Sequence, residues 1–510
     1  MWILYGMLWA LAATDPGPWT TEDGNWTAFR NGGPSTAATK KLPLHWSPAM
    51  STGWQLELPG YGQSAVVVWR NHVYVTSVEG PNKEALLVSC IDLKTGTLLW
   101  KRSQDASQQA PSNYQQSRAA PTPVVDENGL YAFFESGDLL AFTHDGQSRW
   151  TSNLGKEFGP FENRHGLGAS PTQTDSLVIV NLEHQGPSHL VAIDKHDGSV
   201  KWSAERPGSS SWSSPIATSI HGRSQVVVSS GGTVTGYDAA DGSPLWQVND
   251  VVGNSLPSPT PVGNGLLIAA RLPEFGSAAD AAKSNLCLEI AEDQTVQVKW
   301  RAQRMTADYA SPVTIDDCVY VIDKLGILYC LDLETGETHY TERLHLEAWA
   351  TPIAQPGRLY VFGKDGTTKV IKTGAIYREL ATNHLWDAEH PPRPINYVEN
   401  HSQAPTPEGA GLSMGERLKQ GDKDGDGLLS ADELPGRMQA AIKQYDKNED
   451  GALDAAELEE LAARFAARRS DSQANSRDPI VYGVAAAGEA FLVRTGTRLF
   501  CIRQEEVHDE

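Results

Sequence analysis

Two acidic stretches carry the residues whose types and spacing point most directly to chemistry. They read DKDGDGLLSADE over 422–433 and DKNEDGALDAAE over 446–457. Each has an acid at position 1, an acid or amide at 3, an acid at 5, glycine at 6, an oxygen-bearing side chain at 9 and glutamate at 12. Calcium is a hard cation that takes about six to eight oxygen ligands, and a loop with this spacing wraps around it. The pattern predicts two EF-hand loops and two bound calcium ions.

The spacing also assigns the ligands of each ion. In the first loop we expect Asp422, Asp424, Asp426, the backbone carbonyl of Leu428, Ser430 through a water molecule, and both carboxylate oxygens of Glu433. In the second loop we expect Asp446, Asn448, Asp450, the carbonyl of Ala452, Asp454 and Glu457. The alternative interpretation is a solvated acidic surface, but this does not explain why the same spacing occurs twice.

The residues around the loops match the elements that position an EF-hand pair. Residues 413–416 form a capping box that opens a first helix, and apolar residues recur at helical spacing between the loops and after the second one. Leu429 and Leu453 occupy position 8, and we expect them to face each other across a short strand pair. A calcium sensor exposes a methionine-rich groove. Only Met414 and Met438 are available here, which favours a structural or docking role.

Length and charge exclude several classes of partner. The chain has 510 residues, a formal net charge of −21 and an isoelectric point near 5.1. Nucleic acids and anionic membranes need a basic protein surface, so neither is expected as a partner. No apolar run of about 18 residues follows the N-terminus, so no membrane span is expected. A chain of this length can form more than one domain.

The first residues indicate export. Residues 1–12, MWILYGMLWALA, form a short apolar run that ends in an A-x-A cleavage pattern, although no lysine or arginine precedes it. We predict a signal segment and a periplasmic or secreted protein. A buried N-terminal strand is the alternative.

The cysteines point to packing and not to redox chemistry. There are five, without a CxxC pair, which excludes covalent haem and a redox dithiol. Four lie in apolar strand sequences, where a buried thiol packs as a small hydrophobic group. Cys318 and Cys330 flank one predicted hairpin, and one residue of register decides whether they face each other.

The rest of the chain repeats itself at a spacing of about 40–54 residues, the period of propellers and other arrays. The clearest copies are CIDLKTGTLLW (90–100), AIDKHDGSVKW (192–202), GYDAADGSPLW (236–246) and CLDLETGETHY (330–340). Asp-Gly suits the positive φ angles of a two-residue hairpin, and the closing aromatic residue can be buried between neighbouring sheets. A Ser-Pro or Thr-Pro step and two further strands precede each copy, so one unit is a four-stranded propeller blade.

The closing aromatic residues predict eight blades. Six blades end at Trp100, Trp150, Trp202, Trp246, Trp300 and Tyr340, and a seventh ends near Leu380. The strand around Trp54 has no partner before it, and the three strands within 482–502 have none after them. Pairing these segments completes an eighth blade and closes the ring, which removes exposed sheet edges.

The predicted fold is therefore an all-β, eight-bladed β-propeller with an inserted α-helical EF-hand pair. We assign 1–12 to the signal segment, 24–385 to blades one to seven and the closing strand, 389–411 to a Pro-rich linker, 412–469 to the EF-hand pair, 470–479 to a polar linker and 480–504 to the last blade. An appended domain is the alternative to an insert, but the strands of 482–502 argue against it.

The blade sequences resemble the pyrroloquinoline-quinone-repeat (PQQ-like) propellers of bacteria. The resemblance rests on the Asp-x-x-(Thr/Asp)-Gly-x-x-x-Trp tracts and on the Ser-Pro or Thr-Pro strand openings. NWTAFRNGG, over 25–33, is also similar to the Trp-x-x-(Phe/Trp)-Arg-Gly opening of exported members. The resemblance covers 24–385 and 480–504, and it is specific for the fold and not for an activity.

This resemblance implies one of two functions. One branch of the family contains quinoprotein dehydrogenases of alcohols or sugars, which stack the quinone on a tryptophan and in many members cap it with a disulfide between adjacent cysteines. A calcium ion and a catalytic aspartate lie beside the quinone in that branch. The other branch contains non-enzymatic propellers, such as the scaffold lipoprotein of outer-membrane protein assembly. This chain has no Cys-Cys pair, and its tryptophans are accounted for by the blade repeat, so PQQ is not the expected cofactor.

We therefore predict a non-enzymatic binding or scaffold protein that holds two calcium ions and contacts another protein or an envelope component through a face of the propeller. A PQQ- and calcium-dependent dehydrogenase is the alternative. The sequence contains no G-x-S-x-G, H-E-x-x-H or P-loop motif, and no catalytic residue is assigned. His165 and Arg164 open a blade and could form a site that faces the central channel, although a channel-lining or turn histidine is the plainer interpretation. His184 and His196 are expected to be solvated.

Overall fold

The computed structural model divides the chain into two compact units, Met1–Arg393 with Asp478–Glu510, and Pro394–Arg477. In the first unit the described residues are 24–39, 41–50, 52–112, 116–163, 165–271, 284–302, 305–387, 389–392 and 479–504. In the second unit they are 428–430, 433, 446, 448, 450–454 and 457. The segment 1–12, Arg164, most of both linkers, most of the helices predicted around the loops, and Asp422, Asp424 and Asp426 lie outside the described residues.

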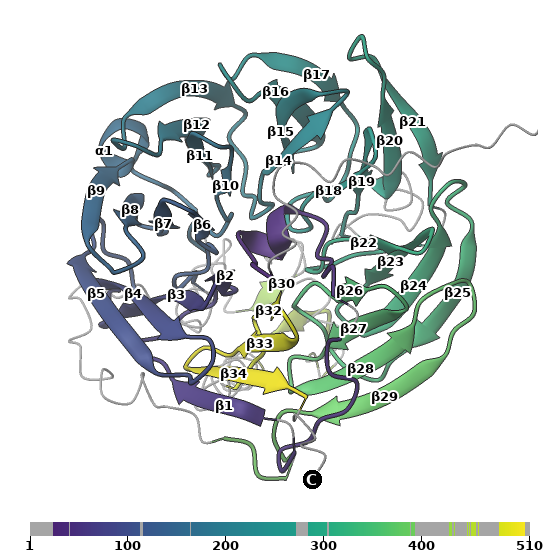
Figure 1. Cartoon of the computed structure of the whole chain (residues 1–510). Coiled ribbons are helices and arrows are strands. Elements are labelled where there is room, and N and C mark those ends of the chain that lie inside the picture. Colours follow the sequence, from purple (N-terminus) through teal and green to yellow (C-terminus); the bar gives the residue numbers. More distant parts are fainter. Residues whose placement is uncertain are drawn as a thin grey trace, which may run out of the picture. The chain divides into compact units, whose positions relative to one another are not determined.

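Eight four-stranded antiparallel sheets form the first unit, in agreement with the predicted propeller. They are arranged as blades around a ring, with one strand of each blade near the axis and three following outward (Figure 1). Seven blades are consecutive in the chain. The first four are β2 (Val67–Trp69), β3 (His72–Glu79), β4 (Ala85–Asp92) and β5 (Leu98–Asp105); β6 (Val124–Asp126), β7 (Gly129–Phe133), β8 (Asp138–Phe142) and β9 (Ser148–Asn153); β10 (Thr172–Gln173), β11 (Leu177–Leu182), β12 (Ser188–Asp194) and β13 (Val200–Arg206); and β14 (Ile216–Ile220), β15 (Arg223–Ser230), β16 (Thr233–Asp238) and β17 (Pro244–Val248).

The remaining blades complete the ring. Blades five to seven are β18 (Thr260–Val262), β19 (Gly265–Ile268), β20 (Leu286–Ile290) and β21 (Val296–Arg301); β22 (Val313–Ile315), β23 (Cys318–Ile322), β24 (Ile327–Asp332) and β25 (Thr338–Arg343); and β26 (Ile353–Gln355), β27 (Arg358–Phe362), β28 (Thr367–Lys372) and β29 (Glu379–His384). The eighth blade has the spatial order β1 (Thr52–Glu57), β34 (Arg498–Arg503), β33 (Ala490–Arg494) and β32 (Gly483–Ala487).

The outer hairpin of a blade forms where the repeat predicts it. In blade one, Asp92 Oδ1 accepts hydrogen bonds from the backbone N–H and the hydroxyl of Thr95 at 2.8 and 2.9 Å. Gly96 follows with a φ of 71°, in the left-handed region that favours glycine. Asp332 and Thr335 make the same two contacts in blade six at 2.8 and 3.0 Å. The aspartate of these repeats is therefore a turn-forming residue.

The closing tryptophan of one blade packs against the turn glycine of the next. Trp150 donates its Nε1–H to the carbonyl of Lys195 at 2.9 Å, and a Cβ placed on Gly198 would lie 2.6 Å from the indole ring. The same hydrogen bond to the following blade is made by Trp54, Trp100, Trp202 and Trp300. The aromatic residues of the repeat thus join neighbouring sheets, as predicted.

Hydrogen bonds to hydroxyl groups link the Ser-Pro and Thr-Pro steps near the axis. The backbone N–H of Thr122 donates to Ser170 Oγ at 3.0 Å, and the N–H of Ser170 donates to Ser214 Oγ at 2.9 Å. This hydroxyl belt starts at the N–H of Ala65 and runs through Thr122, Ser170, Ser214, Ser258, Ser311 and Thr351. The belt satisfies backbone donors that lie between blades, where a donor without an acceptor would be costly.

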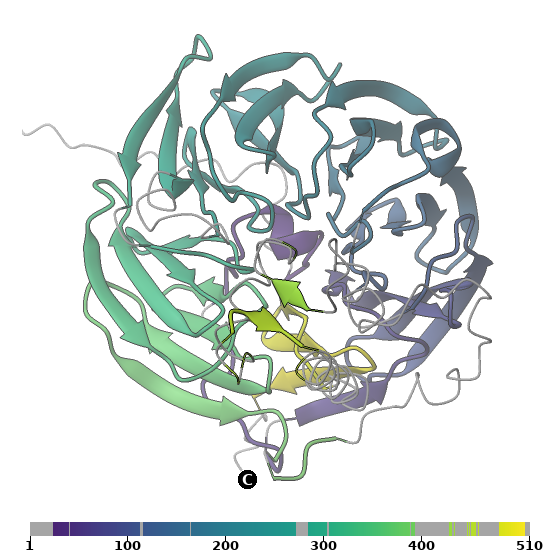
Figure 2. The ribbon, with the colours of Figure 1, turned by 180° about the vertical axis from the view of Figure 1, so that it is seen from behind.

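The ring is closed within blade eight and at its junction with blade one. Within blade eight, the first strand, β1, pairs with β34, and the two strands lie side by side in both views (Figure 2). Neither Ala65 nor Gly483, at the belt positions of this junction, has a hydroxyl group. Instead Arg494, which is fully buried, reaches from blade eight and donates to the carbonyls of Ser64 and Thr76 at 3.3 and 2.5 Å.

Residues 24–37 connect three blades near the axis. The backbone of Trp26 pairs with β2, and that of Thr36 pairs with β26. Between them the 3-10 helix η1 (Phe29–Gly32) lies close to the centre of the ring in Figure 1. Arg30 in this helix is buried and donates to Thr260 Oγ1 in blade five at 2.9 Å. The segment therefore ties blades one, five and seven together.

Helix has a minor place in the described chain. Besides η1, the first unit contains α1 (Gly155–Phe158), a single turn between blades two and three. Over the described residues, a helix with the length and hydropathy needed to cross a bilayer does not occur.

All five cysteines are buried and free, which agrees with the packing role predicted for Cys90, Cys287, Cys330 and Cys501. In the hairpin of β23 and β24, Cys318 lies opposite Asp332, and Cys330 lies opposite Tyr320. The register therefore does not place the two thiols directly across from each other.

Candidate functional site

Hydrogen bonds from its own side chains hold the second acidic loop in a tight turn. Asp446 Oδ2 accepts the N–H of Gly451 at 2.8 Å, and Asp450 Oδ1 accepts the N–H of Ala452 at 3.0 Å. Asn448 Oδ1 accepts the N–H of Asp450, also at 3.0 Å. Gly451 has a φ of 88°, which agrees with the sharp turn that position 6 requires. The side chains at positions 1, 3 and 5 therefore all turn toward one short stretch of backbone.

A two-stranded sheet joins the two loops, as predicted. Its strands are β30 (Leu429–Ser430) and β31 (Ala452–Leu453), which are antiparallel. Leu429 lies directly opposite Leu453, and both are buried. These leucines at position 8 lie next to position 7 of each loop, the position whose backbone carbonyl the spacing predicts as a ligand.

The glutamate at position 12 contacts position 9 in the same way in both loops. Glu457 Oε2 accepts the N–H of Asp454 at 3.0 Å, and Asp454 Oδ1 accepts the N–H of Glu457 at 2.9 Å. In the first loop Glu433 Oε2 accepts the N–H and the hydroxyl of Ser430 at 3.0 and 2.7 Å. The two loops therefore end in equivalent arrangements.

The donor set of the second loop fits calcium by its chemistry. Its predicted ligands are all described, and they supply only oxygen: Asp446, Asn448, Asp450, the carbonyl of Ala452, Asp454 and Glu457. A hard divalent cation prefers such ligands. In the part of the chain that the structure describes, no three Asp, Glu, His or Cys side chains converge as they do around a metal ion. In the second loop, the side-chain oxygens of the predicted ligands accept hydrogen bonds from backbone N–H groups of the same loop. In the first loop the structure places Leu428, Ser430 and Glu433.

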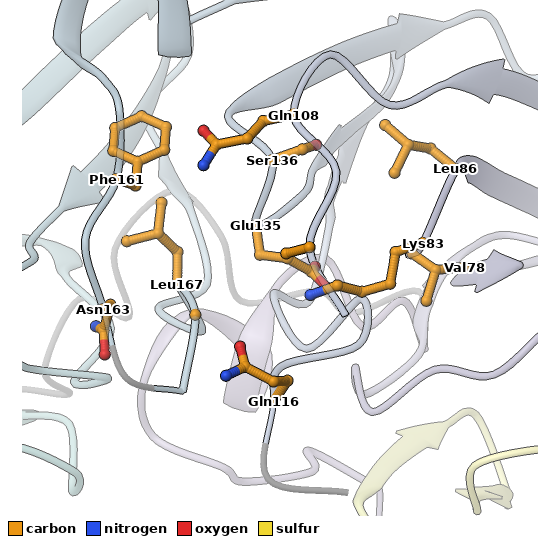
Figure 3. Close-up of a pocket in the computed structure, with 12 residues that line it drawn as sticks. Val78, Lys83, Leu86, Gln108, Gln116, Glu135, Ser136, Phe161, Asn163 and Leu167 are labelled. Atoms are coloured by element: carbon orange, nitrogen blue, oxygen red, sulfur yellow. The ribbon is translucent and has the colours of Figure 1, made fainter. Parts of the chain in front are cut away.

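A second polar site lies in the propeller, in a pocket where blades one to three meet (Figure 3). Lys83 and Glu135 line it and form an ion pair at 3.3 Å, with side chains only 5% and 6% exposed. Lys83 also donates to the carbonyl of Ser117 at 2.9 Å, and Glu135 accepts the N–H of Ala119 at 3.0 Å. Burial raises the pKa of Glu135, and the charge of Lys83 opposes that shift. The pair thus holds 117–119 from both ends.

Sequence reasoning did not find this pair. Lys83 and Glu135 belong to different blades, and no spacing rule connects them. The sequence did mark the segment that the pair holds, because 117–119 lies just before the Thr122-Pro123 step of blade two. We call the stretch that leads into the innermost strand of each blade its lead-in segment.

The histidines singled out in the sequence have different surroundings. His165 lies in the lead-in segment of blade three and packs against Trp212, with ring centroids 5.6 Å apart. His184 is 1% exposed, so its predicted solvation is wrong. Its loop bonds to the segment before blade three, where His184 Nδ1 accepts the N–H of Glu162 at 3.1 Å, and burial lowers the pKa of His184. His196 is exposed, as predicted.

Two family models match this chain, one over propeller residues and one over the two acidic loops. The family model described as outer membrane protein assembly factor BamB matches 50–164 and 160–342, and that of the EF hand matches 416–434 and 438–462. No curated protein matches the chain.

The comparison with solved structures finds matches at low sequence identity. BamB from Moraxella catarrhalis is 12% identical with a TM-score of 0.52, and the match covers 90% of this chain and 99% of that one. A europium-containing methanol dehydrogenase is 11% identical with a TM-score of 0.40, covering 71% of this chain and 86% of that one. The first similarity shows the propeller fold.

Proposed function

Because the chain belongs to the propeller family described as outer membrane protein assembly factor BamB, we propose that it is an extracytoplasmic binding or scaffold protein that holds two calcium ions in its EF-hand pair. The propeller provides the surface for a protein partner. The EF-hand pair adds a calcium-dependent module to the same chain.

The arrangement of the second loop carries the calcium assignment. Its six oxygen donors are present, Gly451 makes the turn at position 6, and Leu453 is paired with Leu429 of the first loop. Bound calcium would be held by these donors and by their equivalents at 422–433, and it would neutralise carboxylates that otherwise repel one another. An exported protein meets calcium near the millimolar range, at which even weak extracellular modules with dissociation constants of about 10⁻⁴–10⁻³ M are occupied.

The blade residues favour binding over catalysis. The aspartate, glycine and tryptophan of the repeat are used in turns and between blades, as Asp92, Gly198 and Trp150 illustrate. The five cysteines are separate from one another in the sequence, which argues against the quinone-capping disulfide of the dehydrogenase branch. The lead-in segments remain as the part of the propeller with side chains available for recognition.

A calcium titration of the whole chain tests the metal assignment. Calorimetry should show two sites per chain. Glu457→Gln removes a bidentate ligand and should leave one site, and the double variant with Glu433→Gln should leave none. Glu127→Gln, at an exposed turn of blade two, is the charge-matched control and should keep both sites. Absence of calcium binding in the native protein, or two sites in the double variant, would contradict the assignment.

A second assay tests the alternative function. The protein is incubated with PQQ and calcium, and dye reduction is followed with alcohols and sugars as substrates. We expect no rate above that of the quinone alone. Dye reduction that requires the protein would replace the proposed function by a dehydrogenase activity.

A further inference from the structure

Five lead-in segments bring an arginine and four aromatic residues to the same end of the innermost strands. Arg118 lies in the segment before β6, and Tyr61 precedes β2. Tyr309, Trp349 and Tyr482 precede β22, β26 and β32. These strands lie around the axis in Figure 1. The blade repeat does not account for these five side chains.

Arg118 is a buried cation that pairs with no anion among the described residues. It is 7% exposed, and its Cζ lies 3.5 Å from the centroid of the Tyr61 ring. Its Nε is sealed from solvent without an acceptor, and over the described residues its guanidinium makes no hydrogen bond or ion pair. By contrast, the buried Arg206 donates to the hydroxyls of Tyr237 and Ser230 at 2.6 and 2.7 Å. A buried charge without a partner is costly, so a missing anionic ligand is the simplest explanation for Arg118.

The backbone around Arg118 is held rigidly. Lys83 bonds the carbonyl before it, and Glu135 bonds the N–H after it, as described above. Gln63 bonds both its N–H and its carbonyl, each at 3.0 Å. Because Glu135 already pairs with Lys83, the nearby carboxylate does not neutralise Arg118. The guanidinium is therefore positioned before any ligand arrives, which lowers the entropic cost of binding.

The four rings form a continuous row, which we call the aromatic row. Tyr61 and Tyr482 have centroids 6.3 Å apart and hydroxyls 2.9 Å apart. Tyr482 and Trp349 are 5.8 Å apart, and Trp349 and Tyr309 are 5.5 Å apart. Tyr309, at the far end from Arg118, is 41% exposed. The row thus begins at a buried cation and ends at an exposed ring.

We propose that Arg118 and the aromatic row bind an extended, acidic segment of a partner polypeptide. A carboxylate of that segment pairs with the guanidinium of Arg118, which has the planar donor geometry that suits a carboxylate. Proline or apolar side chains of the segment lie on the rings, as extended peptides do on aromatic surfaces. This inference rests on the proposed binding function and names the chemistry of the partner.

The length of the row favours a polypeptide over a small anion. Three steps of nearly 6 Å match about five residues of extended chain at roughly 3.3 Å per residue. A small anion would use Arg118 and leave the row without contacts. A nucleic acid would meet a chain of net charge −21, which disfavours its phosphates.

Fluorescence polarisation with labelled peptides on the whole protein tests the inference. The probes are capped seven-residue peptides with a central glutamate flanked by proline and leucine, and their glutamine matches. The glutamate peptides should bind at least about tenfold more tightly, because a charge-assisted pair is lost in the match. Arg118→Gln should remove this preference, and Tyr309→Ala at the exposed end should weaken both peptides alike. Arg149→Gln, which removes another ring-stacked arginine in blade two, should change nothing.

Several outcomes would overturn the inference. It fails if no probe binds, if glutamate and glutamine peptides bind equally, or if millimolar acetate or citrate displaces the glutamate peptide completely, since a small anion would then suffice. Calcium calorimetry and the thermal midpoint of each variant are measured on the same preparations. Two calcium sites together with failed peptide binding would reject this site and leave the calcium part of the proposed function intact.

Discussion

At the scale of single residues, buried polar side chains decide how the propeller responds to pH. The imidazole of His184 is 1% exposed, and its Nε2 has no acceptor in the described part of the chain. Its Nδ1 accepts N–H groups from Glu162 and Gly186, each at 3.1 Å, which requires that this nitrogen carry no proton. Burial also lowers the pKa of His184, because a buried site disfavours the charged imidazolium.

The folded propeller should therefore lose stability on mild acidification. A histidine has a pKa of about 6.5 in the unfolded chain, and the pKa of His184 is lower in the folded protein. Below the unfolded value the unfolded state binds the proton more readily, so the stability present above about pH 6.5 is lost as the pH falls through the folded pKa. His184→Asn, which can keep an acceptor, should reduce the fall in the thermal midpoint between pH 7 and pH 5. His196→Asn, at an exposed turn, should leave that fall unchanged. An unchanged pH dependence in the His184 variant would show that His184 does not cause the acid sensitivity.

At the scale of elements, the contact between a turn glycine and a tryptophan joins one blade to the next. Two properties of the glycine are needed there, namely a positive φ angle and the absence of a Cβ. Gly198 has a φ of 76°, and an added Cβ would lie 2.6 Å from the ring of Trp150. Gly222 has a φ of 75° with nothing within 4 Å of such a Cβ. Substitutions at Gly198 and Gly222 therefore distinguish the cost of backbone strain, which both share, from the cost of disturbing the contact between blades, which only Gly198 makes.

We expect Gly198→Ala to destabilise the protein more than Gly222→Ala. Both variants put a Cβ in the left-handed region, at a cost of about 1–2 kcal/mol. Gly198→Ala must also displace an indole ring from a packed interface, which adds about 1–3 kcal/mol. Denaturant unfolding followed by tryptophan fluorescence measures the difference. Equal midpoints for the two variants would show that the tryptophan contact contributes little.

At the scale of the whole molecule, the ring is closed by segments from the two ends of the blade sequence. β1 supplies the outermost strand of blade eight, and β32 to β34 supply the other three. The hydroxyl belt is interrupted at this junction, where Arg494 bonds to Ser64 and Thr76 of blade one. Burial lowers the pKa of Arg494 to about 9, and its hydrogen bonds go to carbonyl and hydroxyl oxygens. In addition to the pairing of β1 with β34, one buried side chain therefore bridges blades eight and one.

Arg494→Met should weaken the closure. The substitution keeps much of the side-chain volume but leaves the carbonyls of Ser64 and Thr76 without this donor, at about 1–3 kcal/mol for each buried acceptor left unsatisfied. Lys41→Gln breaks an ion pair with Glu489 of blade eight in which both side chains are exposed, and it should leave the thermal midpoint nearly unchanged. Thermal unfolding and limited proteolysis of β1 provide the measurements. An Arg494→Met protein as stable as the native one would show that strand pairing alone closes the ring.

Local patterns in the sequence were sufficient for the blades, their number and the composition of the eighth. The reason is that a hairpin depends on residues a few positions apart, such as Asp92, Thr95 and Gly96, and their repetition marks each unit. The facing leucines of the two acidic loops, Leu429 and Leu453, followed from loop spacing in the same way. The calcium ligands themselves stay a prediction: loop spacing assigns them, and the turn and oxygen donors of the second loop support the assignment.

Only the tertiary structure brought together the residues of the lead-in segments. Lys83 meets Glu135 and Arg118 meets Tyr61 because blades one and two pack side by side, although nothing in either local sequence specifies the other. The burial of His184 also depends on tertiary contacts, since its loop folds against the chain segment that precedes blade three. Local hydrogen bonds and side-chain periodicity determine which elements form, whereas contacts between blades depend on the closed ring and determine which residues surround each buried charge.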